Sequence, residues 1–303
     1  MKNLQELSMK RLFGLLLIYS FFILPSFAEE TKTIESTDSW ILTQYYGGGS
    51  VGMFYSIVNP SDDTLILIDG GWTTNAEQVK SVIEENGGYV DYWIITHYHE
   101  DHCGAFNALW PKYREKINTI LISPLTWEEF EPYCRDWDTP DTFRLYLEQT
   151  ADTQNIKALH RNDQFEIGSL KFTVFNAWDD EILPETNDVA NNCSLVFKVE
   201  GKKTSILFLG DMSASGLAQL LMSKYSAEKL HADYVQAGHH GWGQYGMSFY
   251  ANLQPKEIFI DATDELLNDE NYVDKHGVLI RWCQANEIPV HTHGETPYSI
   301  IFE

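Results

Sequence analysis

The stretch Thr96–Gly104 constrains this chain most, because it places three histidines and two carboxylates directly after the apolar run Asp91–Ile95. We interpret the apolar run as a buried strand, so the polar cluster lies at the strand's carboxyl end, at the edge of a sheet. A single histidine is usually a surface or packing residue, and we assign that role to His160, His231 and His276. The pattern H-x-H-x-D-H instead predicts a metal site at this sheet edge.

Acidic and imidazole side chains follow two further predicted strands in the same way. Asp211 comes after the run Ile206–Gly210, and a histidine pair comes after Val235–Gly238. Side chains at the carboxyl ends of neighbouring strands can converge over one rim of a sheet. The combined set therefore offers enough nitrogen and oxygen donors for two divalent ions. The predicted metal ligands are His97, His99, Asp101, His102, Asp211 and His239.

The spacing of the ligands predicts how they divide between two ions. His97 and His99, two positions apart on a turn, can bind one ion, whereas Asp101 and His102 face the other. Asp211 is placed to bridge both ions, which would hold them about 3.5–4 Å apart.

The histidine pair is predicted to split into a ligand and a catalytic residue. His239, the first residue after the strand and its glycine, is the predicted ligand. His240 is then expected to donate to a substrate oxygen or to protonate the leaving group, although an exchange of the two roles stays open. Asp101 is the second predicted catalytic residue, because beyond binding the second ion it can hold the proton of the nucleophile.

The first 28 residues have the pattern of an export signal. Lys10 and Arg11 precede the apolar run Leu12–Leu24, and Pro25–Ala28 supplies small residues where a signal peptidase requires them. A retained membrane anchor is the alternative, but Pro25 interrupts a run that is already short for crossing a bilayer. We expect residues 1–28 to be a cleaved signal peptide, residues 29–303 to form a single domain, and the mature protein to be secreted or periplasmic.

The charge balance restricts the partners of this domain. Loss of the signal would remove three basic residues and one acidic residue, which changes the formal net charge from −23 to −25. Such an acidic surface repels polyanions, whereas non-specific nucleic-acid binding depends on Lys and Arg that neutralise phosphates. We expect no nucleic-acid partner, no stable membrane insertion after signal cleavage, and a small-molecule or cell-surface substrate. A phosphate ester can still reach a metal centre, since divalent ions are the largest local charges in such a site.

The cysteines leave the redox state of the chain open. Four are present, and none has the C-x-x-C spacing of a zinc knuckle or a redox motif. Free buried thiols and one or two disulfides are both compatible with an exported protein.

The order of predicted elements indicates an α/β fold. A β-meander opens the domain, and helices then alternate with strands up to the carboxyl end. Residues 123–161, where aromatic and acidic residues mix, are expected to form a helical insertion over one rim. The predicted strands are 40–46, 53–58, 64–68, 91–95, 164–167, 170–175, 194–199, 204–209, 233–236, 257–260, 289–292 and 298–302, and the predicted helices are 76–85, 216–225, 248–253 and 272–285.

These motifs together resemble the metallo-β-lactamase superfamily of hydrolases. Its first, second, fourth and fifth motifs look like Leu67–Gly71, His97–His102, Gly210-Asp211 and Gly238-His239 of this chain. The resemblance covers nearly everything after the signal. It implies a four-layer αβ/βα sandwich with the metal ions at one edge of the paired sheets. It also implies that Asp69 orients loop amides or a ligand histidine.

The third motif departs from the family pattern. Most members have a histidine just before the strand that precedes Gly-Asp, where this chain has Val189-Ala-Asn-Asn-Cys-Ser194. The first ion would then be bound by two histidines, Asp211 and water. Its remaining position is expected to be vacant or filled by a carbonyl of Asn191 or Asn192.

The same Asn-Asn-Cys-Ser-Leu-Val stretch, with Gly47–Ser50 and His239–Gly241, looks like one branch of the family. That branch contains the hydrolase domain of the competence protein ComEC and phosphorylcholine-esterase-type enzymes, and its better-understood members act on phosphodiesters. The resemblance implies an exported hydrolase that uses a metal-bound hydroxide on a phosphodiester, with two divalent ions, in the first place zinc, otherwise manganese or iron. Two alternatives stay open: a lactone, thioester or amide hydrolase on the same metal site, and a non-catalytic relative that binds a surface polymer.

Overall fold

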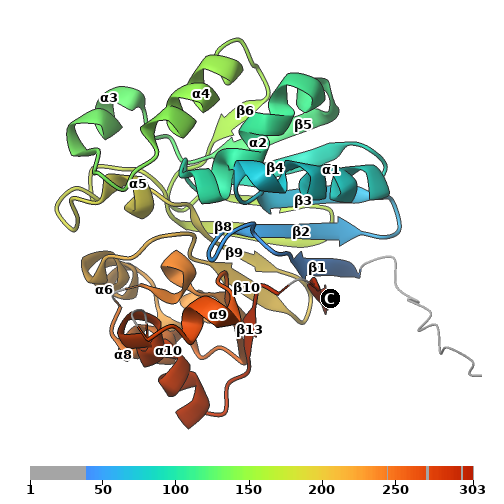
Figure 1. Ribbon diagram of the computed structural model, residues 1–303. Helices are drawn as coiled ribbons and strands as arrows, with labels where there is room; N and C mark the ends of the chain where they lie inside the picture. Colours follow the sequence, from blue (N-terminus) through green and yellow to red (C-terminus); the bar gives the residue numbers. More distant parts are fainter. Residues whose placement is uncertain (1–38, 244, 271–272, 295, 303) are drawn as a thin grey trace, which may run out of the picture. The chain divides into compact units, whose positions relative to one another are not determined.

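Two seven-stranded mixed sheets pack face to face, and helices cover the outer side of each (Figure 1). The computed structural model describes residues 39–243, 245–270, 273–294 and 296–302, so the signal peptide predicted at residues 1–28 lies outside the described residues. The order of layers is helices, sheet, sheet, helices, which confirms the predicted four-layer αβ/βα sandwich.

The first sheet combines an antiparallel and a parallel half. Its strands lie in the order β14-β1-β2-β3-β4-β5-β6, antiparallel from β14 to β3 and parallel from β3 to β6. The bounds are β1 Trp40–Gln44, β2 Phe54–Asn59, β3 Thr64–Asp69, β4 Val90–Ile95, β5 Ile117–Ile122, β6 Ile156–Ala158 and β14 Tyr298–Phe302. The parallel strands therefore end at one common edge, beside which the Thr96–Gly104 stretch begins.

The second sheet repeats this division. Its strands lie in the order β13-β12-β11-β10-β9-β8-β7, parallel from β13 to β10 and antiparallel from β10 to β7. The bounds are β7 Gln164–Ile167, β8 Leu170–Asn176, β9 Val196–Glu200, β10 Ser205–Phe208, β11 Tyr234–Gln236, β12 Glu257–Ile260 and β13 Val290–Thr292. Asp211 and the histidine pair follow two of its parallel strands.

Burial of both faces explains why the central strands are continuously apolar. In β3, Leu65 and Leu67 pack into the core beneath the helices, whereas Ile66 and Ile68 pack into the core between the sheets. All four side chains are fully buried. Successive side chains of a strand point to opposite faces, so an apolar residue is required at every position.

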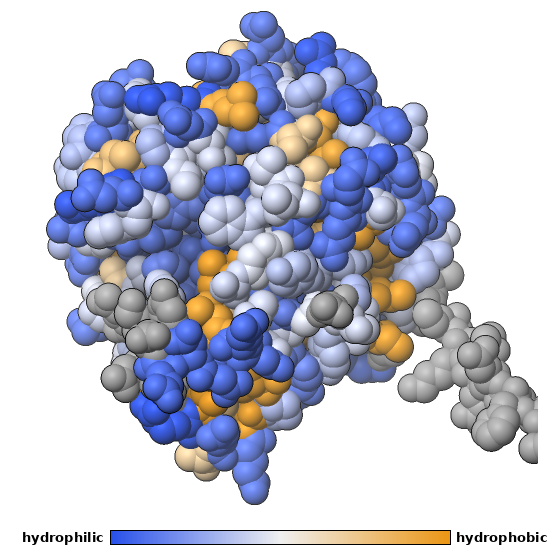
Figure 2. All heavy atoms as spheres, in the orientation of Figure 1, coloured by the Kyte–Doolittle hydropathy of each residue, from blue (hydrophilic) through white to orange (hydrophobic). Residues whose placement is uncertain are grey.

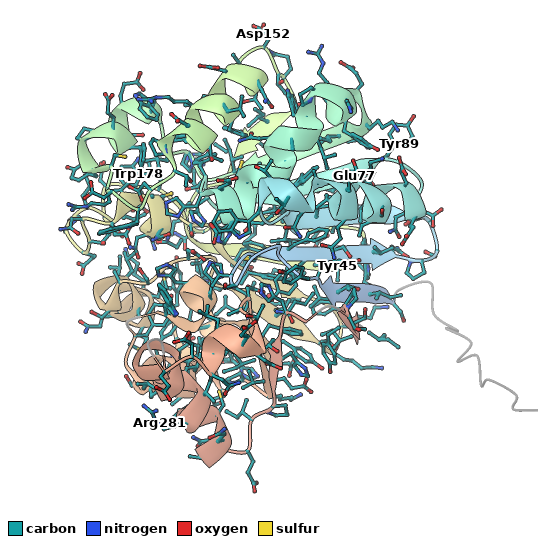
Figure 3. All side chains as sticks on the ribbon, viewed as in Figure 1. Tyr45, Glu77, Tyr89, Asp152, Trp178 and Arg281 are labelled. Carbon is teal, nitrogen blue, oxygen red and sulfur yellow. The ribbon has the colours of Figure 1, made fainter. Side chains whose placement is uncertain are left out.

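The helices turn their charged residues to the solvent. Glu77 on α1 and Arg281 on α10 point away from the sheets (Figure 3). The helix bounds are α1 Ala76–Glu85, α2 Glu100–Tyr113, α3 Trp127–Phe130, α4 Pro140–Thr150, α5 Val189–Asn192, α6 Ser215–Lys224, α7 Ala227–Leu230, α8 Met247–Leu253, α9 Asp264–Leu267 and α10 Val273–Ala285.

Each predicted helix and strand is present, but the structure adds elements where none were predicted. The helix α2 and the strand β5 occupy residues 100–122. The insertion at 123–161 holds the predicted helical segments, α3 and α4, but it ends in β6, which pairs with β5 in parallel. The segment is therefore part of the first sheet as well as a cover for its rim.

The face drawn in Figure 2 is largely hydrophilic. Figure 2 shows hydrophobic residues in small separate groups on the face that it draws. Within the described ranges, no helix has both the length and the apolar character needed to cross a membrane. The four cysteines are unpaired, with Cys134 exposed and the other three buried.

Candidate metal centre

Asp69, at the end of β3, ties the first motif to the second. One carboxylate oxygen accepts a 2.8 Å hydrogen bond from the Thr96 amide, and the other accepts a 2.6 Å bond from the Thr96 hydroxyl. The second oxygen also lies 2.7 Å from His102 Nδ1. Because a carboxylate accepts, Nδ1 carries a proton, which leaves Nε2 as the nitrogen that His102 can offer to a metal ion. The role expected for Asp69, holding a loop amide and a histidine of the cluster, is confirmed.

The helix α2 presents the rest of the second motif. His99 occupies its N-cap position, and Asp101 and His102 lie in the first turn, where a carboxylate is favoured by the helix dipole. Gly104 allows this turn to approach the loop after β3, since a Cβ there would collide with the backbone of Trp72 and Thr73. The second motif is therefore compact because the first turn of α2 packs closely against the loop after β3.

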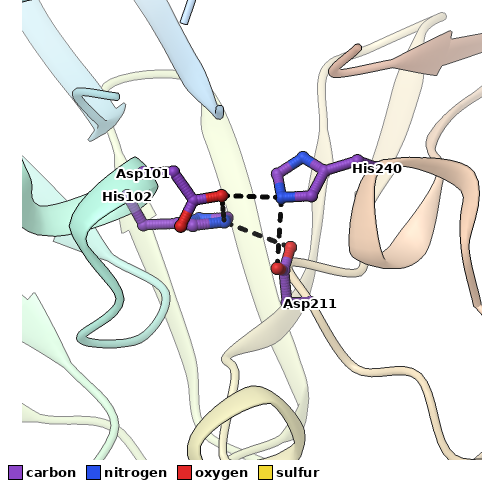
Figure 4. A group of neighbouring side chains, drawn as sticks. All are labelled: Asp101, His102, Asp211 and His240. Atoms are coloured by element: carbon purple, nitrogen blue, oxygen red, sulfur yellow. Dashed lines mark ion pairs between the residues drawn. The ribbon is translucent and has the colours of Figure 1, made fainter. Parts of the chain in front are cut away.

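A first group of donors brings together Asp101, His102, Asp211 and His240, which come from three separate segments (Figure 4). Their donor atoms all lie within 4.8 Å of one another. His102 Nε2 lies 3.2 Å from Asp211 Oδ1, and His240 Nε2 lies 3.2 Å from Asp211 Oδ2. His240 Nε2 also lies 2.9 Å from Asp101 Oδ2.

A second group consists of His97, His99 and Asp211, again with donor atoms within 4.8 Å. His97 Nε2 lies 3.9 Å from Asp211 Oδ2. Asp211 belongs to both groups, in the position predicted for a bridging residue. Its backbone amide donates a 3.0 Å hydrogen bond to Ser194 Oγ, which holds the loop after β10 against the third motif.

The geometry favours an exchange of the roles predicted for the histidine pair. His239 Nε2 lies 3.9 Å from Asp211, and 25% of its side chain is exposed, whereas only 4% of the His240 side chain is exposed. Both residues have positive φ angles, 50° and 53°, so the backbone coils tightly here and turns the second imidazole inward. We therefore place His240 in the first donor group and His239 on the wall of the cavity above it.

Four buried atoms of the two groups have no well-aligned hydrogen-bond partner among the described residues: Nε2 of His97, His102 and His240, and Oδ1 of Asp211. Nε2 of His102 and Nε2 of His240 instead face carboxylate oxygens at 2.9 to 3.2 Å. Buried polar atoms are nearly always hydrogen-bonded, so this concentration of unsatisfied atoms needs an explanation. Imidazole nitrogens and carboxylate oxygens that converge on shared points fit divalent cations of the first transition series. The residues present therefore fit the two ions expected from the sequence.

The charges of the cluster are strongly coupled. Burial opposes ionisation of Asp211, but the imidazoles of His102 and His240 outweigh it and hold the pKa of this carboxyl well below its usual range. Burial likewise opposes protonation of His240, yet Asp211 and Asp101 raise its pKa to about 10. His97, farther from the carboxylates, has a pKa well below its usual value because of burial. A cation would therefore replace protons on part of the cluster and find His97 already neutral.

Asp138 is a member of the site that the sequence did not reveal. Its Oδ1 lies 2.9 Å from His99 Nε2, and its Oδ2 accepts a 2.6 Å hydrogen bond from the Arg135 amide. Burial acts to lower the pKa of His99, but the bond to Asp138 and the charges of the neighbouring carboxylates together outweigh it and raise the pKa. With Nε2 held in this way, Nδ1 is the nitrogen that His99 can offer to an ion. The Asp-Thr-Pro140 pattern signals a helix start, but it does not show which residue Asp138 contacts.

Replacing Asp138 by alanine is expected to lower the affinity of the protein for divalent ions by about 10- to 100-fold, because His99 loses the partner that sets its orientation. Asp141→Ala is the matched control, since the Asp141 side chain is 96% exposed and pairs only with Arg144 among the described residues. Metal titration of the three proteins measures the effect. Equal affinities in Asp138→Ala and wild type would show that His99 needs no such support.

A cavity of about 810 Å³ opens over both donor groups. Trp72, Trp137 and Trp242 line it together with Tyr245, and no Lys or Arg of the described residues does. Trp137 comes from the insertion, so this segment contributes both a wall of the cavity and the partner of His99. Its other lining residues are Val51, His99, Asp101, Thr139, Asp188, Asn191, Asp211, Ser213, His239, His240, Gly241, Gly243, Met247, Val278 and Leu279.

Comparisons with known proteins agree with the fold and the motifs. The sequence profile of the metallo-beta-lactamase superfamily matches residues 48–239. An RNase J-like protein of Methanocaldococcus jannaschii is 26% identical over 191 residues, which cover 60% of this chain and 38% of the relative. The uncharacterised protein YcaI of Escherichia coli is 27% identical over 151 residues, which cover 49% of this chain and 15% of the relative. The chain thus spans well under half the length of either relative.

Two solved structures are similar over most of this chain. YhfI from Bacillus subtilis, described as a metallo-beta-lactamase fold protein, has a TM-score of 0.53 at 12% identity, covering 87% of this chain and 100% of its own. CmlA, a diiron beta-hydroxylase from Streptomyces venezuelae, has a TM-score of 0.51 at 11% identity, covering 88% of this chain and 54% of its own. Likeness at these identities concerns the fold alone.

Proposed function

This chain belongs to the metallo-β-lactamase superfamily, and we propose on that premise that it is an exported, metal-dependent hydrolase of phosphodiesters. The observation that carries the proposal is the pair of donor groups that share Asp211 and contain three buried imidazole nitrogens without a well-aligned hydrogen bond. One ion would be held by His97, His99 and Asp211, and the other by Asp101, His102, Asp211 and His240. Nitrogen and oxygen donors of this kind suit zinc, manganese and iron.

The ions would supply an activated water and stabilise negative charge on a phosphoryl oxygen. The residues of the chain do the rest. Asp69 fixes the tautomer of His102, and Asp138 fixes that of His99. Asp101 lines the cavity with 13% of its side chain exposed, so its carboxylate can hold the proton of the attacking water.

His239 is the group best placed to act on the leaving group. Its side chain lines the cavity and is 25% exposed, so the imidazole can reach a leaving-group oxygen. His240 Nε2 lies within 3.2 Å of two carboxylates, and only 4% of its side chain is exposed. The catalytic histidine of the proposal is therefore His239, and His240 serves the metal.

A phosphodiester is favoured over other esters by two resemblances. The third-motif stretch looks like the branch that contains ComEC and phosphorylcholine-esterase-type enzymes, and one relative carries the name RNase J-like. The cavity argues for a compact substrate, because Lys and Arg are absent from its described lining while three tryptophans are present. A nucleic-acid strand would need cations along its path. We therefore propose a small or cell-surface phosphodiester, reached outside the cytoplasm after cleavage of residues 1–28.

The test is a substrate panel run on the purified protein after elemental analysis of its bound metal. Bis-p-nitrophenyl phosphate and a choline phosphodiester are expected to be hydrolysed, chelation to abolish the activity, and added metal to restore it. Lactone, thioester and amide substrates are the comparison arm. Faster turnover of one of these substrates would show that the protein is instead a lactone, thioester or amide hydrolase. The absence of bound ions after gentle purification would favour the polymer-binding alternative.

A further inference from the structure

The donor group around His97 has one member fewer than its neighbour. It holds two imidazoles and Asp211, whereas the other group holds four side chains. The histidine that the third motif usually provides is absent from Val189–Ser194, which forms the short helix α5 and the turn into β9. The inference that follows rests on the proposed metal-dependent function, and it concerns what this chain offers in place of that histidine.

Asn192 is excluded because all of its polar groups are occupied. Its side-chain oxygen accepts hydrogen bonds of 2.9 Å from the amides of both Ser213 and Ala214. Its side-chain nitrogen donates a 2.8 Å bond to the Asp188 carbonyl, and its own backbone carbonyl accepts a 3.1 Å bond from Asn176. Asn192 therefore fixes the loop after Asp211 and has no free oxygen for an ion.

Asn191, in contrast, has a side-chain oxygen that is not occupied by a hydrogen bond among the described residues. Its side chain is only 2% exposed and lines the cavity beside His99, Asp211 and His239. Its nitrogen donates a 3.0 Å hydrogen bond to Asp188 Oδ2, whereas its oxygen has no partner among the described residues. A carboxylate can only accept, so the nitrogen must face Asp188 and the orientation of the amide is unambiguous.

We propose that the side-chain oxygen of Asn191 is the ligand that completes the first metal site in place of the missing histidine, with Asp188 as its positioning residue. A buried amide oxygen without a partner loses the free energy of a hydrogen bond, and coordination of a cation recovers it. The carboxylate of Asp188 polarises the amide toward greater negative charge on its oxygen, in the way that carboxylates raise the basicity of ligand histidines. The backbone oxygen of Asn191 does not compete, since it accepts from the Ser194 amide at 3.2 Å.

The experiment is a titration of metal-free protein with zinc alone, followed by isothermal calorimetry. Wild type is expected to bind two ions. Asn191→Ala is expected to bind one with unchanged affinity and the other at least about 100-fold more weakly, because a direct ligand is worth no less than its supporting partners. Asn191→His is expected to restore the second ion, since imidazole is the ligand that the family uses at this position. Asp188→Asn is expected to weaken the second ion about 10-fold.

Asn155→Ala is the matched control, because Asn155 donates a 2.6 Å hydrogen bond to Ile117, at the opposite end of β5 from the site. Thermal melting of each variant without metal verifies that it folds, and Asp188→Asn tests the proposal independently if Asn191→Ala does not. Two full-affinity ions in both of these variants would overturn the inference. If wild type binds two ions but hydrolyses no phosphodiester, the proposed function fails and the assignment of Asn191 stands.

Discussion

Replacement of Asp211 by alanine is expected to lower phosphodiester turnover at least ~1,000-fold, which corresponds to about 4 kcal/mol of transition-state stabilisation. Asp211 is the residue shared by both donor groups, and its carboxylate lies 3.2 to 3.9 Å from Nε2 of four histidines. No neighbouring carboxylate can replace it, because Asp101 faces one group only. The variant is also expected to lose both ions, whereas loss of a ligand to one ion would leave the other bound.

His99→Ala provides the comparison, since it removes a ligand from the second donor group alone. It is expected to abolish turnover but to retain one ion in elemental analysis. Asp91→Ala is the control, because Asp91 lies at the start of β4, away from the site, and accepts a 2.9 Å hydrogen bond from the Leu65 amide. Substantial activity in both Asp211→Ala and His99→Ala would reject the site.

Much of the fold follows from local sequence patterns, and the exceptions have a physical cause. Strands such as β3 are recognisable as short apolar runs between turn residues because both of their faces are buried. Helix α2 was missed because Cys103, Ala105 and Leu109, on different sides of it, are all buried, so no polar face repeats every 3.6 residues. Pro111 within the helix also argues against it. The strand β5 was not predicted either, because it follows α2 closely and its short apolar run also fits the end of a helix.

The candidate site also combines residues that local sequence patterns predict with contacts between residues that lie far apart in the sequence. Donors that follow a strand by two to seven residues are predictable, because the strand end fixes their position. The contacts that decide which of these donors can bind a metal ion are not predictable from the sequence. Asp138 reaches His99 from 39 residues away, and the difference between Asn191 and Asn192 depends on which amides the loop after Asp211 turns toward them. Which of His239 and His240 points into the donor group depends on the backbone conformation, since both residues are left-handed. Glycine is the residue type that indicates a left-handed conformation in a sequence, and neither residue is glycine.

The departure in the third motif and the insertion at 123–161 both contribute to the lining of the cavity over the second donor group. The insertion holds His99 through Asp138, and the third motif contributes Asn191 to the lining of the same cavity. Trp137, next to Asp138, extends the cavity wall above them. The part of the site that departs from the family pattern is thus the part that the aromatic-rich segment 123–161 borders, and we expect substrate preference to be determined there.

Asp69→Ala is expected to lower the free energy of unfolding by about 3–5 kcal/mol, even without metal, because it removes one partner of a fully buried ion pair. The Thr96 amide and hydroxyl lose their acceptor at the same time. Urea denaturation in the presence of a chelator measures this effect apart from metal binding. Asp62→Ala is the control, since Asp62 accepts comparable bonds from the Thr64 amide and hydroxyl in an exposed turn.

Asp69→Asn separates the backbone requirement from the charge. Asp69 has a φ of 52°, a conformation in which asparagine is among the best tolerated residues, so the turn after β3 is expected to survive. The amide can still accept from Thr96, but it cannot supply two accepting oxygens, and His102 loses the carboxylate that fixes its tautomer. Metal affinity is therefore expected to fall about 10- to 100-fold, with less loss of stability than in the alanine variant. If the asparagine variant bound metal as tightly as wild type, the tautomer of His102 would be set by the ion itself, and Asp69 would serve the fold alone.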